Sequence, residues 1–114
     1  MLHLIETSLA DDKAADPVVV DLAGKTSIAD AMVIATGTSQ RHLATMAEHL
    51  LERLKAAGVR GVGAEGQGQS DWVLIDAGDV IVHLFKEEVR RFYDLERLWR
   101  APASGVVVAA EARA

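Results

Sequence analysis

The sequence contains no cysteine, which excludes a disulfide framework and a thiolate metal site. It has no apolar run near the ~20 residues that a helix needs to cross a bilayer. Residues 1–16 do not resemble a secretory signal peptide, because they carry one base, Lys13, against four acids (Glu6, Asp11, Asp12 and Asp16). We therefore expect a cytoplasmic protein with no membrane association.

Basic residues are also few: the sequence has 12 lysines and arginines and 17 aspartates and glutamates, which gives a formal net charge of -5. Affinity for a phosphate backbone follows the number of cationic contacts, so this balance predicts little direct contact with nucleic acid. Half of the 114 residues are hydrophobic, which is enough for one folded domain with a real core. A partner, if there is one, should be bound mainly through protein.

The first half of the chain alternates helical and strand patterns. Apolar spacing predicts a helix over 3–14 that Pro17 ends, followed by buried strands over 18–22 and 31–36. Thr38 or Ser39 can cap the next helix, which Gly58 closes. That helix is the clearest element, because its apolar residues recur every three or four positions: Leu43, Met46, Ala47, Leu50, Leu51 and Leu54.

The second half begins with a glycine-rich stretch, in which 61–65 gives a weak strand signal. Two apolar runs, 72–76 and 79–85, flank Ala77-Gly78 and predict a hairpin. Short helical segments over 87–92 and 93–99 should follow, and the chain beyond Pro102 should be a flexible tail. Together these elements predict an α/β fold with a mixed sheet of about five strands flanked by helices.

All five aromatic residues lie between positions 72 and 99. We expect Phe85, Phe92 and Leu98 in the core and keep Trp72 as an interface candidate, since tryptophan is enriched at binding hot spots. Strand alternation places Trp72, Leu74 and Asp76 on one face and Val73 and Ile75 on the other. If helices cover the second set, the first forms an open apolar patch of the kind that marks a partner site.

Signals for catalysis or cofactor binding are weak. Residues 61–66 match G-x-G-x-x-G, but a helix precedes the run and a strand follows it, which reverses the order that a dinucleotide site needs. None of the four histidines pairs with another at the spacing of a zinc site. No cofactor or metal is expected, and we do not expect an enzyme.

One enzymatic alternative stays open. Gly37-Thr38-Ser39 lies between a predicted strand and helix, where nucleotidyltransferases hold a triphosphate, and Asp71, Asp76 and Asp79 are the nearby carboxylate candidates for Mg²⁺. A minimal nucleotidyltransferase would use Ser39 with Asp76 and Asp79. A further alternative is a structural protein that only assembles with itself.

Three segments together resemble one family, the ribosomal silencing factors (RsfS, or Iojap). They are 26–30 running on to 33–39, Arg41-His42, and 72–83 running on to 92–99. The resemblance spans roughly 3–99, so we expect a family domain over 1–100 and a flexible C-terminal tail over 101–114 outside it. Two positions depart from the family pattern, which often has aromatic residues where this chain has Ala31 and Ala77.

The resemblance implies a fold related to nucleotidyltransferases without their catalytic carboxylates. It also implies binding to ribosomal protein L-fourteen on the large ribosomal subunit, a steric block on subunit joining, and translation repression when nutrients are limited. Family members tend to be homodimers when free. The resemblance and the strand alternation together indicate these partner-binding residues: Trp72, Leu74, Asp76, Ala77, Asp79, His83 and Tyr93.

Overall fold

A computed structural model describes residues 1–24, 29–66 and 71–92 of the chain. These residues form three helices and five strands. In chain order they are α1 (Leu2–Asp11), β1 (Ala15–Asp21), β2 (Ala31–Gly37), α2 (Gln40–Ala56), β3 (Gly63–Glu65), β4 (Trp72–Asp76), β5 (Val80–Lys86) and α3 (Glu87–Phe92).

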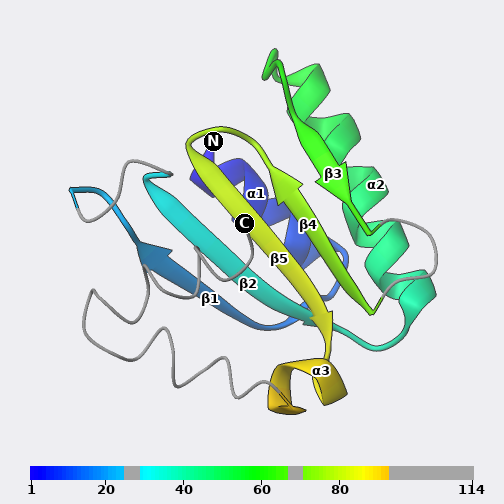
Figure 1. Ribbon diagram of the computed structural model, residues 1–114. Coiled ribbons are helices and arrows are strands. Elements are labelled where there is room, and N and C mark those ends of the chain that lie inside the picture. The colour runs from blue at the N-terminus through cyan, green and yellow to red at the C-terminus, as the bar shows by residue number, and fades with distance from the viewer. Residues whose placement is uncertain (25–28, 67–70, 93–114) are drawn as a thin grey trace.

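The five strands make one sheet in the order β1-β2-β5-β4-β3. Strands β2 and β5 pair in parallel, from Ala31↔Val80 to Gly37↔Lys86, and the other three pairs are antiparallel. A parallel pair requires a long crossover, which α2, β3 and β4 supply here. The predicted α/β fold with a mixed sheet flanked by helices is confirmed (Figure 1).

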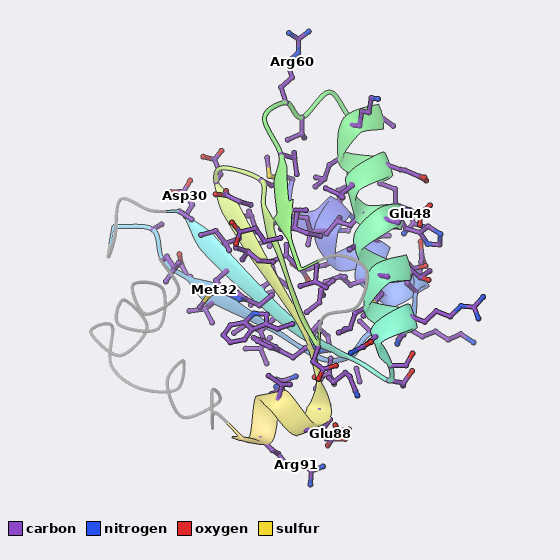
Figure 2. All side chains as sticks on the ribbon, turned by 45° about the vertical axis from the view of Figure 1, so that its right-hand side comes forward. Asp30, Met32, Glu48, Arg60, Glu88 and Arg91 are labelled. Carbon is purple, nitrogen blue, oxygen red and sulfur yellow. The ribbon has the colours of Figure 1, made fainter. Side chains whose placement is uncertain are left out.

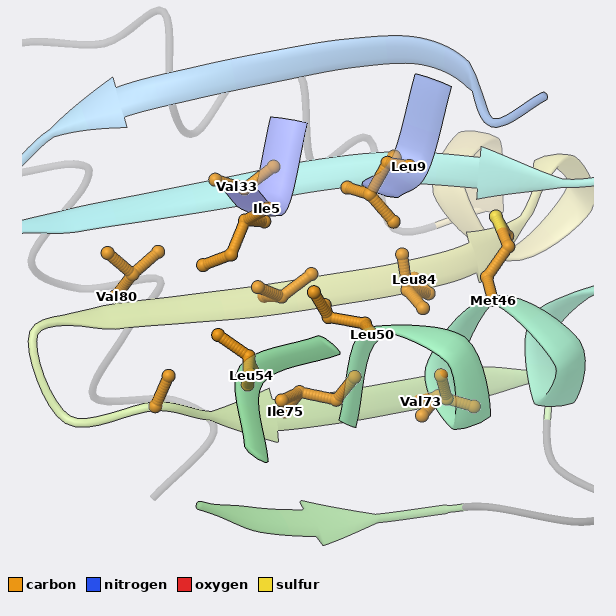
Figure 3. Packing of buried hydrophobic residues seen from close by; sticks show 14 of the residues in the cluster. Ile5, Leu9, Val33, Met46, Leu50, Leu54, Val73, Ile75, Val80 and Leu84 are labelled. Atoms are coloured by element: carbon orange, nitrogen blue, oxygen red, sulfur yellow. The ribbon is translucent and has the colours of Figure 1, made fainter. Parts of the chain in front are cut away.

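Helices α1 and α2 pack side by side on the same face of the sheet (Figure 1). Ile5 and Leu9 of α1 and the apolar stripe of α2 meet strand residues that point toward the helices (Figure 3). The core below the helices includes Val33, Leu43, Met46, Leu50, Leu54, Val73, Ile75, Val82 and Leu84, each at most 1% exposed. Burial of this apolar area is the main source of the domain's stability.

Helix α2 has the ends that the sequence predicts. The Ser39 hydroxyl accepts the backbone N–H of His42 at 3.0 Å and so satisfies a free donor of the first turn. At the other end Gly58 has a φ of +85°, and Val59 N–H bonds to Leu54 O at 3.0 Å. This Schellman arrangement needs the left-handed conformation that glycine adopts without strain.

The predicted end of the first helix is wrong. Helix α1 stops at Asp11, where Lys13 adopts a left-handed φ of 61° and the N–H of Ala14 bonds to Leu9 O. Pro17 therefore does not terminate the helix but lies inside β1, on the sheet edge. The register shifts between Ala15 and Val18, which suits a residue that has no N–H for a ladder.

The hairpin exists, but its turn is longer than predicted. Strand β5 begins at Val80, so Asp79 belongs to the turn together with Ala77 and Gly78. Phe85 is 1% exposed, which confirms its place in the core. The Phe92 side chain, the predicted turn over 93–99 with Leu98, and the predicted tail over 101–114 lie outside the described residues. No helix among the described residues has the length and apolar character to span a membrane.

Leu50 gives a direct test of this packing. Leu50 is 0% exposed in the core between α2 and the sheet. We therefore expect Leu50→Ala to lower the free energy of unfolding by about 2–5 kcal/mol, because apolar burial is lost and a cavity remains. Urea denaturation followed by circular dichroism measures the change. Leu51→Ala is the matched control, because Leu51 is only partly buried, and equal losses for the two variants would contradict the packing.

Candidate functional site

The sheet has a second apolar face, on the side away from α1 and α2. We call it the Trp72 face and define it by its second cluster of packed residues: Val18, Val20, Leu22, Ala29, Met32, Ile34, Trp72, Ile81, Phe85 and Val89, together with Leu74 and His83, which share its register. Figure 2 shows Met32 on this side of the sheet and Glu48 on the outer side of α2.

Exposure differs across the Trp72 face. Its centre is closed, since Met32, Ile34 and Phe85 are 1–3% exposed. Toward β4, Trp72 and Leu74 are half-buried and Asp76 is exposed, whereas Val73 and Ile75 are buried under the helices. The predicted alternation along β4 is therefore present. The solvent-accessible part of the Trp72 face is therefore smaller than the face itself.

Three rings form a compact group on this face. The Trp72 and Phe85 ring centroids are 4.6 Å apart and tilted by 54°, and the His83 ring lies parallel to Phe85 at 5.7 Å. The indole Nε1–H of Trp72 donates to Nδ1 of His83 at 3.2 Å. Trp72 is thus held by a ring contact with Phe85 and a hydrogen bond to His83.

Two predicted contact residues are buried. His83 is 3% exposed, so its ring supports Trp72 and presents almost no surface of its own. Ala77 is 6% exposed and belongs to the core under the helices, because its side chain turns inward at the end of β4. Tyr93, also a predicted contact residue, lies outside the described residues.

The turn aspartates are exposed, and the backbone around them is fixed. Asp76 Oδ1 accepts the N–H of Gly78 at 2.9 Å, as aspartate commonly does in tight turns. The carbonyl of Asp79 accepts the N–H groups of both Asp30 and Ala31, at 2.8 and 3.1 Å. The exposed carboxylates of Asp30, Asp76 and Asp79 therefore gather at one end of the sheet, where β5 begins, whereas Trp72 lies at the opposite end of β4.

The nucleotidyltransferase arrangement is not assembled. Ser39 follows the last residue of β2, whereas Asp79 bonds to the first residue of that strand. Seven strand residues separate these ends, which corresponds to roughly 20 Å. Two polar groups of the Gly37-Thr38-Ser39 turn are also occupied internally, because Thr38 N–H donates to His42 Nδ1 at 2.9 Å and Ser39 Oγ accepts the N–H of His42 at 3.0 Å.

The order of the elements around the glycine-rich run, residues 61–66, argues against a dinucleotide site. Helix α2 precedes residues 61–66, and Gly63–Glu65 within the run is strand β3. No helix opens at its end in the described residues up to Gly66, so the run offers no helix N-terminus to a pyrophosphate. Among the described residues there is also no group of three or more histidine, aspartate or glutamate side chains that could hold a metal ion.

Sequence reasoning missed the residue that ties α3 to the sheet. Arg90 is 4% exposed, and its Nη1 donates to Thr36 Oγ1 at 2.7 Å and to Asp16 O at 2.9 Å. Arginine is rarely buried without partners. In the sequence, Arg90 stands out only as a residue of a short predicted helix after β5. This position does not indicate that its partner, Thr36, lies 54 positions earlier in the chain.

A second missed cluster joins the two long helices. The carboxylate of Asp12 lies 3.0 Å from His49 Nδ1 and 3.6 Å from Arg53 Nη1, and Arg53 also donates to Ser8 Oγ at 2.7 Å. His42 Nε2 contacts Asp12 O at 2.7 Å. The two histidines of α2 thus hold the end of α1, a role that their spacing alone does not indicate.

The chain is similar to known proteins over most of its length. The family described as "Ribosomal silencing factor during starvation" matches residues 1–113. A protein of Zymomonas mobilis named "Ribosomal silencing factor RsfS" is 52% identical over 99 residues, covering 87% of this chain and 74% of that protein. A Mus musculus protein named "Mitochondrial assembly of ribosomal large subunit protein 1" is 33% identical, over 86% of this chain and 44% of its own length.

The fold is similar to that of a crystal structure as well. A Chromobacterium violaceum protein superimposes with a TM-score of 0.81 at 39% sequence identity, covering 89% of this chain and 84% of that one. The similarity therefore covers most of the chain in fold as well as in sequence.

Thr36 provides a test of how α3 is anchored. We expect Thr36→Val, which keeps the shape but removes the Oγ1 acceptor of buried Arg90, to lower the free energy of unfolding by about 1.5–3 kcal/mol. Thermal and urea unfolding measure the loss. Thr45→Val on the exposed side of α2 is the matched control, and a Thr36 variant as stable as this control would show that the anchor contributes nothing.

Proposed function

The chain belongs to the ribosomal silencing factor family, and we propose that it binds the large ribosomal subunit through ribosomal protein L-fourteen. Bound there, the domain occupies space that the small subunit needs, prevents subunit joining and represses translation under nutrient limitation. The proposal requires no catalysis, no cofactor and no metal. The resemblance of 72–83 to the family's hairpin segment supports the choice of partner, and we propose that the protein acts in the cytoplasm.

The observation that carries the proposal is the position of Trp72. Its indole is half-buried on a sheet face that α1 and α2 leave uncovered, next to half-buried Leu74. A tryptophan that is ordered by its neighbours and still partly accessible has the properties of an interface hot spot. The proposed contact centres on Trp72 and Leu74, with Asp76 and Asp79 at its rim and Tyr93 as a further contact residue.

Charge favours a protein surface over ribosomal RNA. The exposed carboxylates of Asp30, Asp76 and Asp79 surround the turn beyond Leu74, at the end of β4 opposite Trp72, and no described cation pairs with them. Such a rim repels phosphates and is complementary to basic side chains of a ribosomal protein. The net charge of -5 acts in the same direction.

The rigid sheet explains how a small domain can act as an obstacle. Strand β4 pairs with β5, which pairs with β2 along its full length, so a partner held at Trp72 is connected to the whole sheet and to the helices behind it. A steric block needs only tight placement and bulk. An interface of standard size, on the order of 1,200–2,000 Å², gives specific binding.

Removing the indole should separate binding from folding. We expect Trp72→Ala to weaken cosedimentation with free large subunits by at least about 30-fold, or ~2 kcal/mol, as the loss of a hot-spot aromatic does. Val19→Ala is the matched control, because Val19 is an exposed apolar residue on edge strand β1 that points away from the Trp72 face. Wild-type-like binding by a folded Trp72 variant would refute the proposed contact.

We also propose that the free chain is a homodimer, as the family resemblance implies. Light scattering of the purified protein should then give twice the 12.2 kDa mass of one chain. Adding large subunits should transfer the protein into the subunit fraction. A monomer would contradict the dimer, and a dimer that ignores large subunits would instead favour a protein that only assembles with itself.

A further inference from the structure

We propose that His83 is a positioning residue, whose neutral ring holds the Trp72 indole in the orientation that docks on the partner. This inference rests on the proposed function, because the consequence of the orientation is measured as binding. It changes the role of His83 from a contact residue to the support of one. The argument uses the register of the hairpin, the hydrogen bond between the two rings and the difference in their exposure.

The register of β4 and β5 brings the rings together. Trp72 lies directly opposite Phe85, and Leu74 lies opposite His83, so His83 is the diagonal neighbour of Trp72 on the same face. Diagonal pairs across antiparallel strands are within reach of aromatic side chains. The observed ring centroids, 6.0 Å apart for Trp72 and His83, agree with this geometry.

The hydrogen bond fixes the protonation state of His83. An indole Nε1–H can only donate, and it points at Nδ1 of His83 from 3.2 Å. Nδ1 must therefore carry a lone pair, which leaves the proton of the neutral ring on Nε2. The parallel stacking on Phe85, at an interplanar angle of 8°, holds the imidazole in the plane that this acceptor needs.

His83 and Trp72 differ in solvent exposure, and we infer different roles for them from this difference. His83 is 3% exposed, so a partner meets almost none of its surface, whereas Trp72 is only half-buried. A tryptophan free to change rotamer would lose conformational entropy on docking, and holding it in place beforehand removes part of that cost. The contribution of His83 to binding should therefore depend on the Trp72 N–H.

A double-mutant cycle tests this dependence. His83→Phe keeps a ring of similar size but removes the acceptor, and His83→Asn places an amide oxygen near the position of Nδ1. Trp72→Phe keeps an aromatic ring but removes the N–H. Each variant, and the Trp72→Phe/His83→Phe pair, is assayed for cosedimentation with large subunits, and the indole Nε1–H resonance of Trp72 is recorded by NMR in the variants that retain it.

We expect His83→Phe to weaken binding about five- to tenfold, the usual value of one neutral hydrogen bond, with His83→Asn recovering a clear part of the loss. In the Trp72→Phe background, His83→Phe should cause little further loss, because the two changes remove the same interaction. The Nε1–H resonance should move upfield and broaden in His83→Phe and return toward its original position in His83→Asn.

Each possible result either supports or overturns the inference that His83 positions Trp72. Additive losses in the cycle, or no recovery in His83→Asn, would overturn it and return His83 to a direct or purely structural role. If His83→Phe fails to fold, the comparison of His83→Asn with wild type and with Trp72→Phe still decides it. Wild-type protein that does not sediment with large subunits would refute the proposed function, while the NMR signal would still report whether His83 holds the indole.

Discussion

The parallel pairing of β2 with β5 is the constraint on which the rest of this structure depends. Every residue of β2 is buried, and so are five of the seven residues of β5, because both strands carry apolar side chains on both faces. A strand pair of this kind is stable only when each face is covered. Helices α1 and α2 cover one face, and the cluster around Ile34 and Phe85 forms on the other.

The two faces have different consequences. The side chains on the face that the helices cover form a closed core, which stabilises the domain. The other face ends toward β4 in a half-buried tryptophan, whose hydrogen bond to His83 and contact with Phe85 link it directly to the central pair. The proposed docking residue is thus the outermost member of a packed group. Its rigidity comes from the same strands that hold the domain together.

The same topology separates the residues that the nucleotidyltransferase alternative would use. A triphosphate site would need the turn after β2 and the turn aspartates to converge, but the parallel register places them at opposite ends of the sheet. His42 further occupies the backbone donor of Thr38. A family defined by ribosomal silencing is consistent with a scaffold that acts by binding and bulk.

Elements with strong local signals could be predicted from the sequence. The stripe and caps of α2, the alternation along β4 and the apolar runs of β2 and β5 were predicted because a periodic pattern, a serine cap or a glycine acts within a few residues. The same locality explains the errors at Pro17 and Asp79. The burial of His83 and Ala77 could not be predicted in this way, because it depends on how the helices and strands pack. The bond of Arg90 to Thr36 and the contacts of Asp12 with His42 and His49 were equally out of reach, because each joins residues that are 30 or more positions apart in the chain.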